Sequence, residues 1–293
     1  MSYFKILGFE KEPFSTSPDP DFLYLAKDHD TVLMNTLIEL RLRRGLSVIL
    51  GDVGTGKTTL SRKLIQELKD REDFIFHMVL DPSFSDEHSF LDYLARSLDI
   101  PTQGLSSAVA LRDTLEKYLF QKGVIEGKIV VLIIDEAQKL NETSLEMLRV
   151  LFNYETNEFK LIQIVLLGQL ELHSKIIDIA NFFDRISFKY TLNPLSKEET
   201  KEMIEFRIKK AGYKSSMHLF LDEAISEVYQ ASKGYPRRIT MLCHRLLKEL
   251  ILKNKVVVDA NFVKSIIRKD IQSGWHHDDA LNREQALVYQ FQR

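Results

Sequence analysis

Between residues 46 and 192, short runs of apolar and β-branched residues alternate with segments whose apolar residues recur every three or four positions. The short runs have the length of β-strands, and the longer segments have the period of amphipathic helices. The alternation predicts five strands, at residues 46–50, 74–80, 129–134, 161–167 and 187–191. The third and fourth are almost entirely apolar, as in strands that helices cover on both faces. We therefore expect an α/β fold with a five-stranded parallel sheet.

Beyond Pro194 the strand pattern stops and only helical periodicity remains. Ser196 and Glu199 are spaced as in a capping box that opens a helix, and Gly212 is placed to end it. Three further helices are predicted at residues 222–233, 236–252 and 259–271. The pattern indicates a small all-helical domain, a lid, over residues 193–271 after the α/β domain of residues 31–192.

The two ends of the chain have weaker patterns. Pro13, Pro18 and Pro20 stand among serine and aspartate, which favours turns, so residues 1–30 are expected to form an N-terminal strap. Residues 272–293 are expected to form a polar tail. His276 and His277 in this tail are of metal-binding type, but adjacent residues in a weakly structured segment do not make a preformed site.

Composition narrows the class of protein. The chain has 293 residues, of which 44% are hydrophobic, so a disordered or fibrous chain is excluded. Its 40 Lys and Arg against 42 Asp and Glu give a net charge of −2, so binding to nucleic acid or to an anionic membrane would need a local patch. A single cysteine, Cys243, excludes a disulfide framework and a multi-cysteine zinc site.

Hydropathy suggests where the protein works. The start of the chain has no pattern typical of a signal peptide. The most apolar stretch, residues 129–134, is far shorter than the roughly 20 residues that a membrane helix needs. We expect a cytoplasmic protein without a transmembrane segment, which would reach the inner membrane only through a partner.

A glycine-rich segment follows the first predicted strand. Residues 51–58 fit G-x-x-x-x-G-K-[ST], and a helical segment at 59–68 comes next. The glycines let backbone N–H groups and the helix N-terminus face phosphates, while Lys57 would reach the β and γ phosphates and Thr58 would ligate Mg²⁺. A chance glycine-rich turn is disfavoured by this context. We expect ATP to be bound by Gly51, Asp52, Val53, Gly54, Thr55, Gly56, Lys57, Thr58 and Thr59.

Two carboxylates end the third predicted strand. Asp135 and Glu136 follow the apolar run 129–134, at the strand end where open α/β sheets bind ligands. Asp135 is placed to hold Mg²⁺ through water, and Glu136 to polarise the water that attacks the γ-phosphate. An acidic pair that merely solvates a strand end is the alternative, which the nearby phosphate loop disfavours.

Phosphoryl transfer also needs an orienting group and positive charge near the γ-phosphate. Gln169, after the fourth strand, is a candidate to position the lytic water, although it could be an ordinary polar residue. Arg185, before the fifth strand, is a candidate arginine finger for a neighbouring subunit; a surface salt bridge with Asp184 is the alternative. Arg237 opens a helix of the predicted lid, and Arg238 could serve equally well.

The order of these motifs resembles that of the AAA+ ATPases. More narrowly, residues 3 to about 250 resemble the general secretion pathway protein A (ExeA-like) family. The markers are Phe9, Pro13-Phe14-Ser15, Ser17-Pro18-Asp19-Pro20, Phe22-Leu23-Tyr24, His29, Asp135-Glu136-Ala137-Gln138, residues 145–153, Gly168-Gln169, Glu171-Leu172, Arg185-Ile186 and residues 234–237.

The resemblance implies an ATP-driven homo-oligomeric switch, a ring or a filament, that acts on a partner in envelope or pilus assembly. It implies that Lys57, Thr58, Asp135 and Glu136 are the Walker residues. It also implies that Gln169 is a sensor, Arg185 an arginine finger and Arg237 a sensor in the lid. It also places His29 near the adenine, although His29 could equally be a surface residue at a helix start.

A second function remains open. Transposition regulators of the TniB and TnsC type have a similar fold and form ATP-dependent filaments on DNA. The basic run Arg41-Leu42-Arg43-Arg44 is a candidate contact to the phosphate backbone. A solvated helix face is the preferred interpretation of this run, because the whole chain is nearly neutral.

Overall fold

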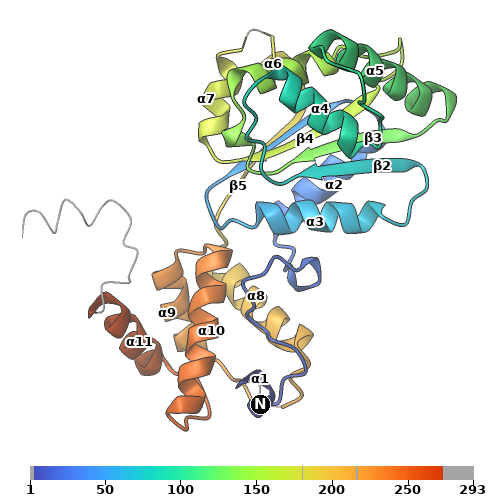
Figure 1. Ribbon diagram of the computed structural model, residues 1–293. Coiled ribbons are helices and arrows are strands. Elements are labelled where there is room, and N and C mark those ends of the chain that lie inside the picture. The colour runs from blue at the N-terminus through green and yellow to red at the C-terminus, as the bar shows by residue number, and fades with distance from the viewer. Residues whose placement is uncertain (1–2, 180, 216, 273–293) are drawn as a thin grey trace, which may run out of the picture. The chain divides into compact units, whose positions relative to one another are not determined.

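The computed structural model describes residues 3–179, 181–215 and 217–272, and these fall into two compact units (Figure 1). The α/β unit consists of residues 16–195 together with 235–237. The helical unit consists of the described residues among 1–15, 196–234 and those from 238 onward. Each unit has its own buried apolar residues.

The α/β unit is built on one parallel sheet of five strands in the order β2-β3-β4-β1-β5. The strands are β1 (Leu46–Gly51), β2 (Phe74–Val79), β3 (Ile129–Ile134), β4 (Ile162–Gly168) and β5 (Ile186–Leu192). The predicted fold class is thus confirmed, and each strand lies within one residue of its predicted bounds. Every residue of the three inner strands is buried, as expected for strands with helices on both faces.

Alternate strand residues supply two separate cores. Ile49, Val131 and Ile133 pack toward α2 (Lys27–Arg41) and α3 (Lys57–Leu68). Val48 and Leu132 pack on the opposite face, which is covered by α4 (Glu87–Ser97), α5 (Ala108–Phe120), α6 (Glu142–Leu151) and α7 (Glu171–Ile177) (Figure 1). Four short turns of helix complete the unit: η1 (Pro20–Phe22), η2 (Gln121–Ile125), η3 (Ala137–Lys139) and η4 (Phe183–Arg185).

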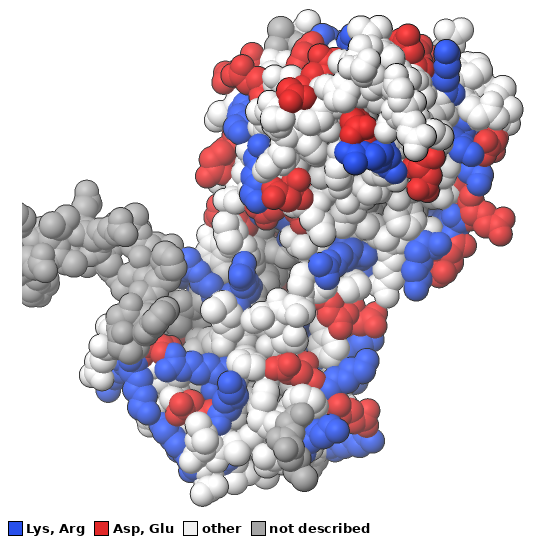
Figure 2. Space-filling model, viewed as in Figure 1, with Lys and Arg blue, Asp and Glu red and all other residues white. Residues whose placement is uncertain are grey.

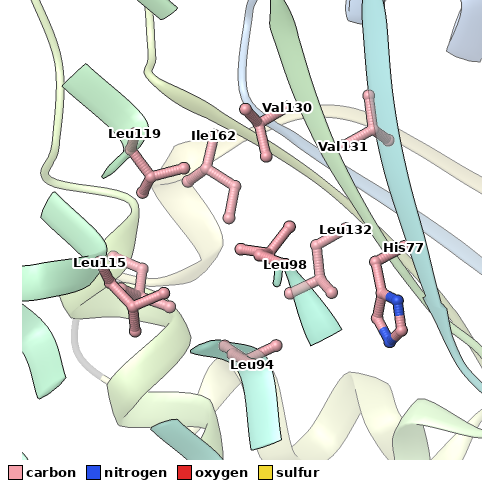
Figure 3. Close-up of a pocket in the computed structure, with 10 residues that line it drawn as sticks. His77, Leu94, Leu98, Leu115, Leu119, Val130, Val131, Leu132 and Ile162 are labelled. Atoms are coloured by element: carbon pink, nitrogen blue, oxygen red, sulfur yellow. The ribbon is translucent and has the colours of Figure 1, made fainter. Parts of the chain in front are cut away.

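The core beneath α4 and α5 is closely packed. Leucines of both helices face strand residues of β3 around a space of only about 10 Å³, with His77 of β2 at one side (Figure 3). A space of this size holds at most one water molecule. Burial lowers the pKa of His77, which favours the neutral imidazole here. This space is therefore part of the core and not a ligand site.

The helical unit contains α1 (Tyr3–Ile6), α8 (Lys197–Lys210), α9 (Asp222–Ser232), α11 (Ala260–Gln272) and, from residue 238 onward, α10 (Pro236–Leu252). The predicted capping box is confirmed: the Ser196 hydroxyl accepts from the N–H of Glu199 at 3.1 Å, and the Glu199 carboxylate accepts from the N–H of Ser196 at 2.9 Å. Apolar faces of α9, α10 and α11 form the core of the unit, which includes Cys243.

The segment expected to form a strap is shared between the units. In the helical unit, the N–H groups of Glu10 and Lys11 both donate to the carbonyl oxygen of Ala211, and Phe14 packs on Phe220 with 6.0 Å between the ring centroids. From residue 16 onward the segment belongs to the α/β unit, and α2 begins at Lys27. Residues 273–293, with His276 and His277, lie outside the described part of the chain. Within residues 3–272, apart from 180 and 216, no helix is long and apolar enough to cross a bilayer.

Candidate nucleotide site

Three neighbouring strands end at the same edge of the sheet. The order β3-β4-β1 brings the ends of these strands together, and all three run parallel. β1 leads into the glycine-rich loop, β4 into Gln169, and β3 into Asp135 and Glu136. Parallel α/β sheets bind ligands at this edge. The fold therefore brings the glycine-rich loop and Gln169, which are more than 100 residues apart in sequence, to the same edge as Asp135 and Glu136.

The glycine-rich loop has the backbone that phosphate binding requires. Gly54 and Gly56 have φ angles of 88° and 101°, in a region that other residues rarely adopt. A Cβ at Gly56 would come within 2.9 Å of the Nε2 atom of His29. α3 begins at Lys57, two residues before the predicted start, so the N–H groups of its first turn point into the loop.

Lys57 is buried at the base of the loop, with 6% of the residue exposed. Its ammonium group donates to the carbonyl oxygens of Gly51 at 2.7 Å and Asp52 at 3.0 Å. Burial lowers the pKa of Lys57, and the nearby carboxylates of Glu136 and Asp135 oppose that shift. A buried ammonium ion beside N–H groups favours an anion, because opposite charge offsets its cost of burial.

Asp135 is buried at the end of β3, with 2% of the residue exposed. Burial raises its pKa, while hydrogen bonds from the Thr58 side chain and from the N–H of Glu136, the latter at 2.9 Å, oppose the shift. A carboxylate and a hydroxyl side by side are oxygen donors of the kind that Mg²⁺ takes together with substrate phosphates. Asp135 and Thr58 thus fit a magnesium ion.

Glu136 lies one residue beyond, in the left-handed region with φ of 51°. Its Oε2 atom accepts a hydrogen bond from Nε2 of Gln138 at 2.7 Å. The Oε1 atom of Gln138 in turn accepts from the backbone N–H of Gln169 at 3.0 Å. Glu136 and Gln169 are therefore joined through Gln138, a residue that the sequence analysis noted as a family marker without a role.

His29 contacts the glycine-rich loop from α2. Only 1% of the residue is exposed, and its Nε2 atom lies 2.8 Å from the carbonyl oxygen of Thr55. The side chain therefore packs against the loop and is not a surface residue. Its expected place near the adenine stays a prediction.

Tyr235 and Arg237 also contact the glycine-rich loop. The Tyr235 hydroxyl donates to the Asp52 carboxylate at 2.8 Å, and the N–H of Arg237 donates to the carbonyl oxygen of Gly54 at 3.2 Å. Arg238 belongs to the other compact unit. Tyr235 lies within the family marker at residues 234–237, but sequence reasoning gave it no role, because nothing in its local pattern connects it with a residue 183 positions earlier.

Arg185 lies apart from these groups in its own chain. Its guanidinium group donates to the carbonyl oxygen of Arg149 at 3.2 Å and to Oδ1 of Asn153 at 2.5 Å, at the C-terminal end of α6. A helix C-terminus carries partial negative charge and favours a cation there. Arg185 is thus held at the surface, half-buried, by groups of α6.

The basic run that we considered for DNA contacts is partly structural. Arg43 has a φ angle of 53° and donates to the carbonyl oxygens of Gly123 at 3.1 Å and Gly127 at 2.7 Å. Its guanidinium group also lies 4.3 Å from the centroid of the Phe159 ring. On the face shown in Figure 2, acidic and basic side chains are mixed over the α/β unit.

Two further features bear on ligand binding. A cavity of about 380 Å³ lies between β1, β5 and α7, lined among others by Leu50, His173, Ile176 and Phe183, but it contains none of the predicted site residues. In the described ranges, no group of three or more His, Cys, Asp or Glu side chains could hold a metal ion.

Comparison with known proteins agrees with this geometry. Residues 40–176 match the family of the AAA domain. The chain is 34% identical over 247 residues to general secretion pathway protein A of Aeromonas hydrophila, a match that covers 84% of this chain and 44% of the relative. The chain thus spans less than half the length of that relative.

Solved structures share the fold at low sequence identity. The structure of the Aeropyrum pernix ORC2 protein in its ADPNP–ADP complexes has a TM-score of 0.61 and 17% identity, covering 82% of this chain and 66% of that chain. The structure of Drosophila ORC bound to DNA has a TM-score of 0.65 and 17% identity, covering 92% and 66%. At this level of identity the likeness concerns the fold alone.

Proposed function

Because the chain belongs to the AAA+ ATPases related to general secretion pathway protein A, we propose that it binds Mg-ATP and hydrolyses it to ADP and phosphate. The observation that carries this proposal is the shared edge of β1, β4 and β3, where Lys57, Asp135 and Glu136 lie close enough to influence one another's charge. A phosphate-binding loop, two carboxylates and a lysine at one edge provide the groups that phosphoryl transfer requires.

Each group has a distinct task in this proposal. Lys57 contacts the β and γ phosphates, and Thr58 and Asp135 hold the magnesium ion, which neutralises developing charge on the phosphate oxygens. Glu136 accepts a proton from the attacking water. Gln169 contributes a side-chain amide beside that water. ATP turnover by the purified protein with and without Mg²⁺, measured as phosphate release, tests the proposal directly.

We propose further that the active form is a homo-oligomer and that Arg185 completes the site of a neighbouring subunit. Support comes from the position of Arg185 directly before β5, at the opposite edge of the parallel sheet from the strand ends that lead into the site, where groups of α6 hold it at the surface. We expect Arg185→Ala to lower hydrolysis by about 10³-fold while ATP affinity changes little. Arg96→Ala, at an exposed arginine that pairs with Asp92, is the matched control.

A mixing experiment separates action in trans from action in cis. Arg185→Ala and Glu136→Gln should each be inactive alone. If Arg185 acts on a neighbour, an equimolar mixture regains activity, because some interfaces combine an intact Glu136 from one subunit with an intact Arg185 from the next. Failure of the mixture to regain activity, with subunit exchange verified, would remove the trans assignment.

The helical unit has a proposed role as a lid that responds to nucleotide through Arg237. The contacts of Tyr235 and Arg237 with Asp52 and Gly54 support this proposal, since ATP bound at the loop must affect the same backbone. Arg237→Ala and Arg238→Ala form a matched pair, and only Arg237→Ala is expected to change nucleotide affinity. Equal affinities for the two variants would overturn the assignment.

The relative named for a general secretion pathway suggests what the ATPase cycle serves. We propose that the oligomer drives assembly of a protein partner in the cell envelope or a pilus. The partner would be expected to stimulate phosphate release. Binding of double-stranded DNA at low salt is the comparison experiment, because it would instead favour the transposition-regulator function. If DNA binds, the double variant Arg41→Ala with Arg44→Ala tests whether these side chains cause the salt dependence of binding. Arg43 is left unchanged because it has internal contacts.

A further inference from the structure

Gln138 stands at the centre of a hydrogen-bond chain at the strand edge. Its amide nitrogen donates to Oε2 of Glu136 at 2.7 Å, and its amide oxygen accepts from the N–H of Gln169 at 3.0 Å. A glutamine amide is both donor and acceptor, so one side chain can connect a carboxylate with a backbone N–H group. Neither leucine nor glutamate at this position could make both bonds.

The backbone around Gln138 is fixed by its neighbours. The ammonium group of Lys175 in α7 donates to the carbonyl oxygens of Gln138 at 2.5 Å and Leu140 at 2.9 Å. Gly168 permits a close approach, because a Cβ there would lie 3.3 Å from the backbone nitrogen of Gln138. The turn η3 is thus anchored to both α7 and the end of β4.

Glu136 itself needs such a support. Its φ of 51° is unusual for a residue with a side chain, and this conformation persists only where the surroundings fix it. The bond from Gln138 occupies one carboxylate oxygen of Glu136. The second oxygen can then accept a proton from water with the carboxylate already oriented.

From this arrangement we propose that Gln138 is a positioning residue for hydrolysis: it orients the Glu136 carboxylate and ties that carboxylate to the backbone beside the sensor Gln169. The inference rests on the proposed ATPase function and adds a residue to it. Gln138 contacts neither ATP nor the reacting water in this proposal, so its removal should affect the chemical step and not nucleotide binding.

Two substitutions separate the two hydrogen bonds. Gln138→Met has a similar length and removes both, whereas Gln138→Glu keeps an acceptor for the N–H of Gln169 and removes the donor to Glu136. We expect both variants to lower kcat by about 10- to 100-fold, as for loss of orientation at a catalytic group. The KM for ATP and the dissociation constants of ADP and ATP should stay within about twofold of the parent values.

Lys139→Ala is the matched control. Lys139 lies in the same turn, but its ammonium group pairs with the exposed Asp81 at 3.3 Å, so the variant should keep the parental kcat. Thermal unfolding of all three variants shows whether the turn itself is intact. A purely structural role for Gln138 would lower the melting temperature and nucleotide affinity together with kcat.

The outcomes are distinguishable. If the parent protein binds Mg-ATP but releases no phosphate, the proposed ATPase function fails irrespective of Gln138. If the parent hydrolyses ATP and Gln138→Met matches or exceeds its kcat, Gln138 does not position Glu136. If Gln138→Glu keeps the parental kcat while Gln138→Met has a lowered kcat, only the bond to Gln169 affects hydrolysis. The proposal that Gln138 orients the Glu136 carboxylate is then overturned.

Discussion

Buried polar groups behave differently in the two units of this protein. In the α/β unit, Lys57 and Asp135 are buried near the edge of the sheet where the strands end. Burial lowers the pKa of Lys57 and raises the pKa of Asp135, and both shifts favour the neutral form of the side chain. In the helical unit, the buried Arg207 instead donates to the hydroxyl of Thr240 at 2.6 Å, between two helices. Under the proposed function, phosphate and a metal ion would offset the cost of burying Lys57 and Asp135, whereas the buried Arg207 has a hydrogen-bond partner within the helical unit. This contrast is consistent with a ligand site in the α/β unit and with a structural role for Arg207 in the helical unit.

The largest expected effect is on catalysis in the α/β unit. Glu136→Gln removes the proposed base and should lower ATP hydrolysis by about 10²- to 10⁴-fold, while ATP remains bound. Glu205→Gln, a substitution on the surface of α8 in the helical unit, is the control and should leave turnover unchanged. Phosphate release and nucleotide retention, measured on the same samples, check both. Parental turnover by Glu136→Gln would contradict the proposed role of this carboxylate.

The next effect concerns the helical unit. Thr240→Val removes the acceptor for the buried Arg207 guanidinium group and should lower the free energy of unfolding by about 1–3 kcal/mol, because a polar group then loses a partner in the interior. Thr240→Ser keeps the hydroxyl and should lose much less. Denaturant unfolding measures both variants. If valine and serine gave the same stability, the Arg207–Thr240 bond would contribute little.

A smaller effect of opposite sign is expected at Asp135. Its pKa is raised by burial, so the ionised form at neutral pH destabilises the ligand-free protein. Asp135→Asn keeps the shape and the hydrogen-bond acceptor and should raise stability by about 1 kcal/mol, while Mg-ATP hydrolysis is lost. Asp81→Asn is the contrasting control, since a hydrogen bond from Ser83 and the ion pair with Lys139 lower the pKa of that exposed carboxyl. Thermal unfolding without nucleotide compares the two variants with the parent. If Asp135→Asn were less stable than the parent, burial of the ionised Asp135 would not destabilise the protein.

Local pattern predicted much of this architecture. The inner strands are apolar on both faces, so their positions and the parallel sheet followed from the sequence, and the glycine-rich loop was recognisable from its spacing. The start of α3 was placed two residues too late, because Lys57 is both the phosphate-loop lysine and the first helical residue. The helix begins directly after Gly56, whose positive φ ends the loop, and the periodicity of apolar residues does not reveal such a backbone angle.

Contacts over long sequence distances were not predictable from the same pattern. Tyr235 reaches Asp52 across 183 residues, and Gln138 reaches Gln169 across 31. One signal for Gln138 was present: a polar side chain lies three residues after Asp135, close to the strand edge where ligands bind. Its role depends on the turn η3, which places the amide between two strand ends.

The binding of Mg-ATP to the glycine-rich loop is the claim on which the rest depends. Equilibrium binding of Mg-ATP to the parent, Lys57→Ala and Lys63→Ala tests it. Lys63 is the control, because it lies six residues further along α3 and pairs with Glu67 at 2.8 Å. The account predicts parental affinity for Lys63→Ala and a loss of about 10- to 100-fold for Lys57→Ala, as for removal of a hydrogen-bonding charge. No retention of Mg-ATP by the parent, or equal retention by Lys57→Ala, would contradict it.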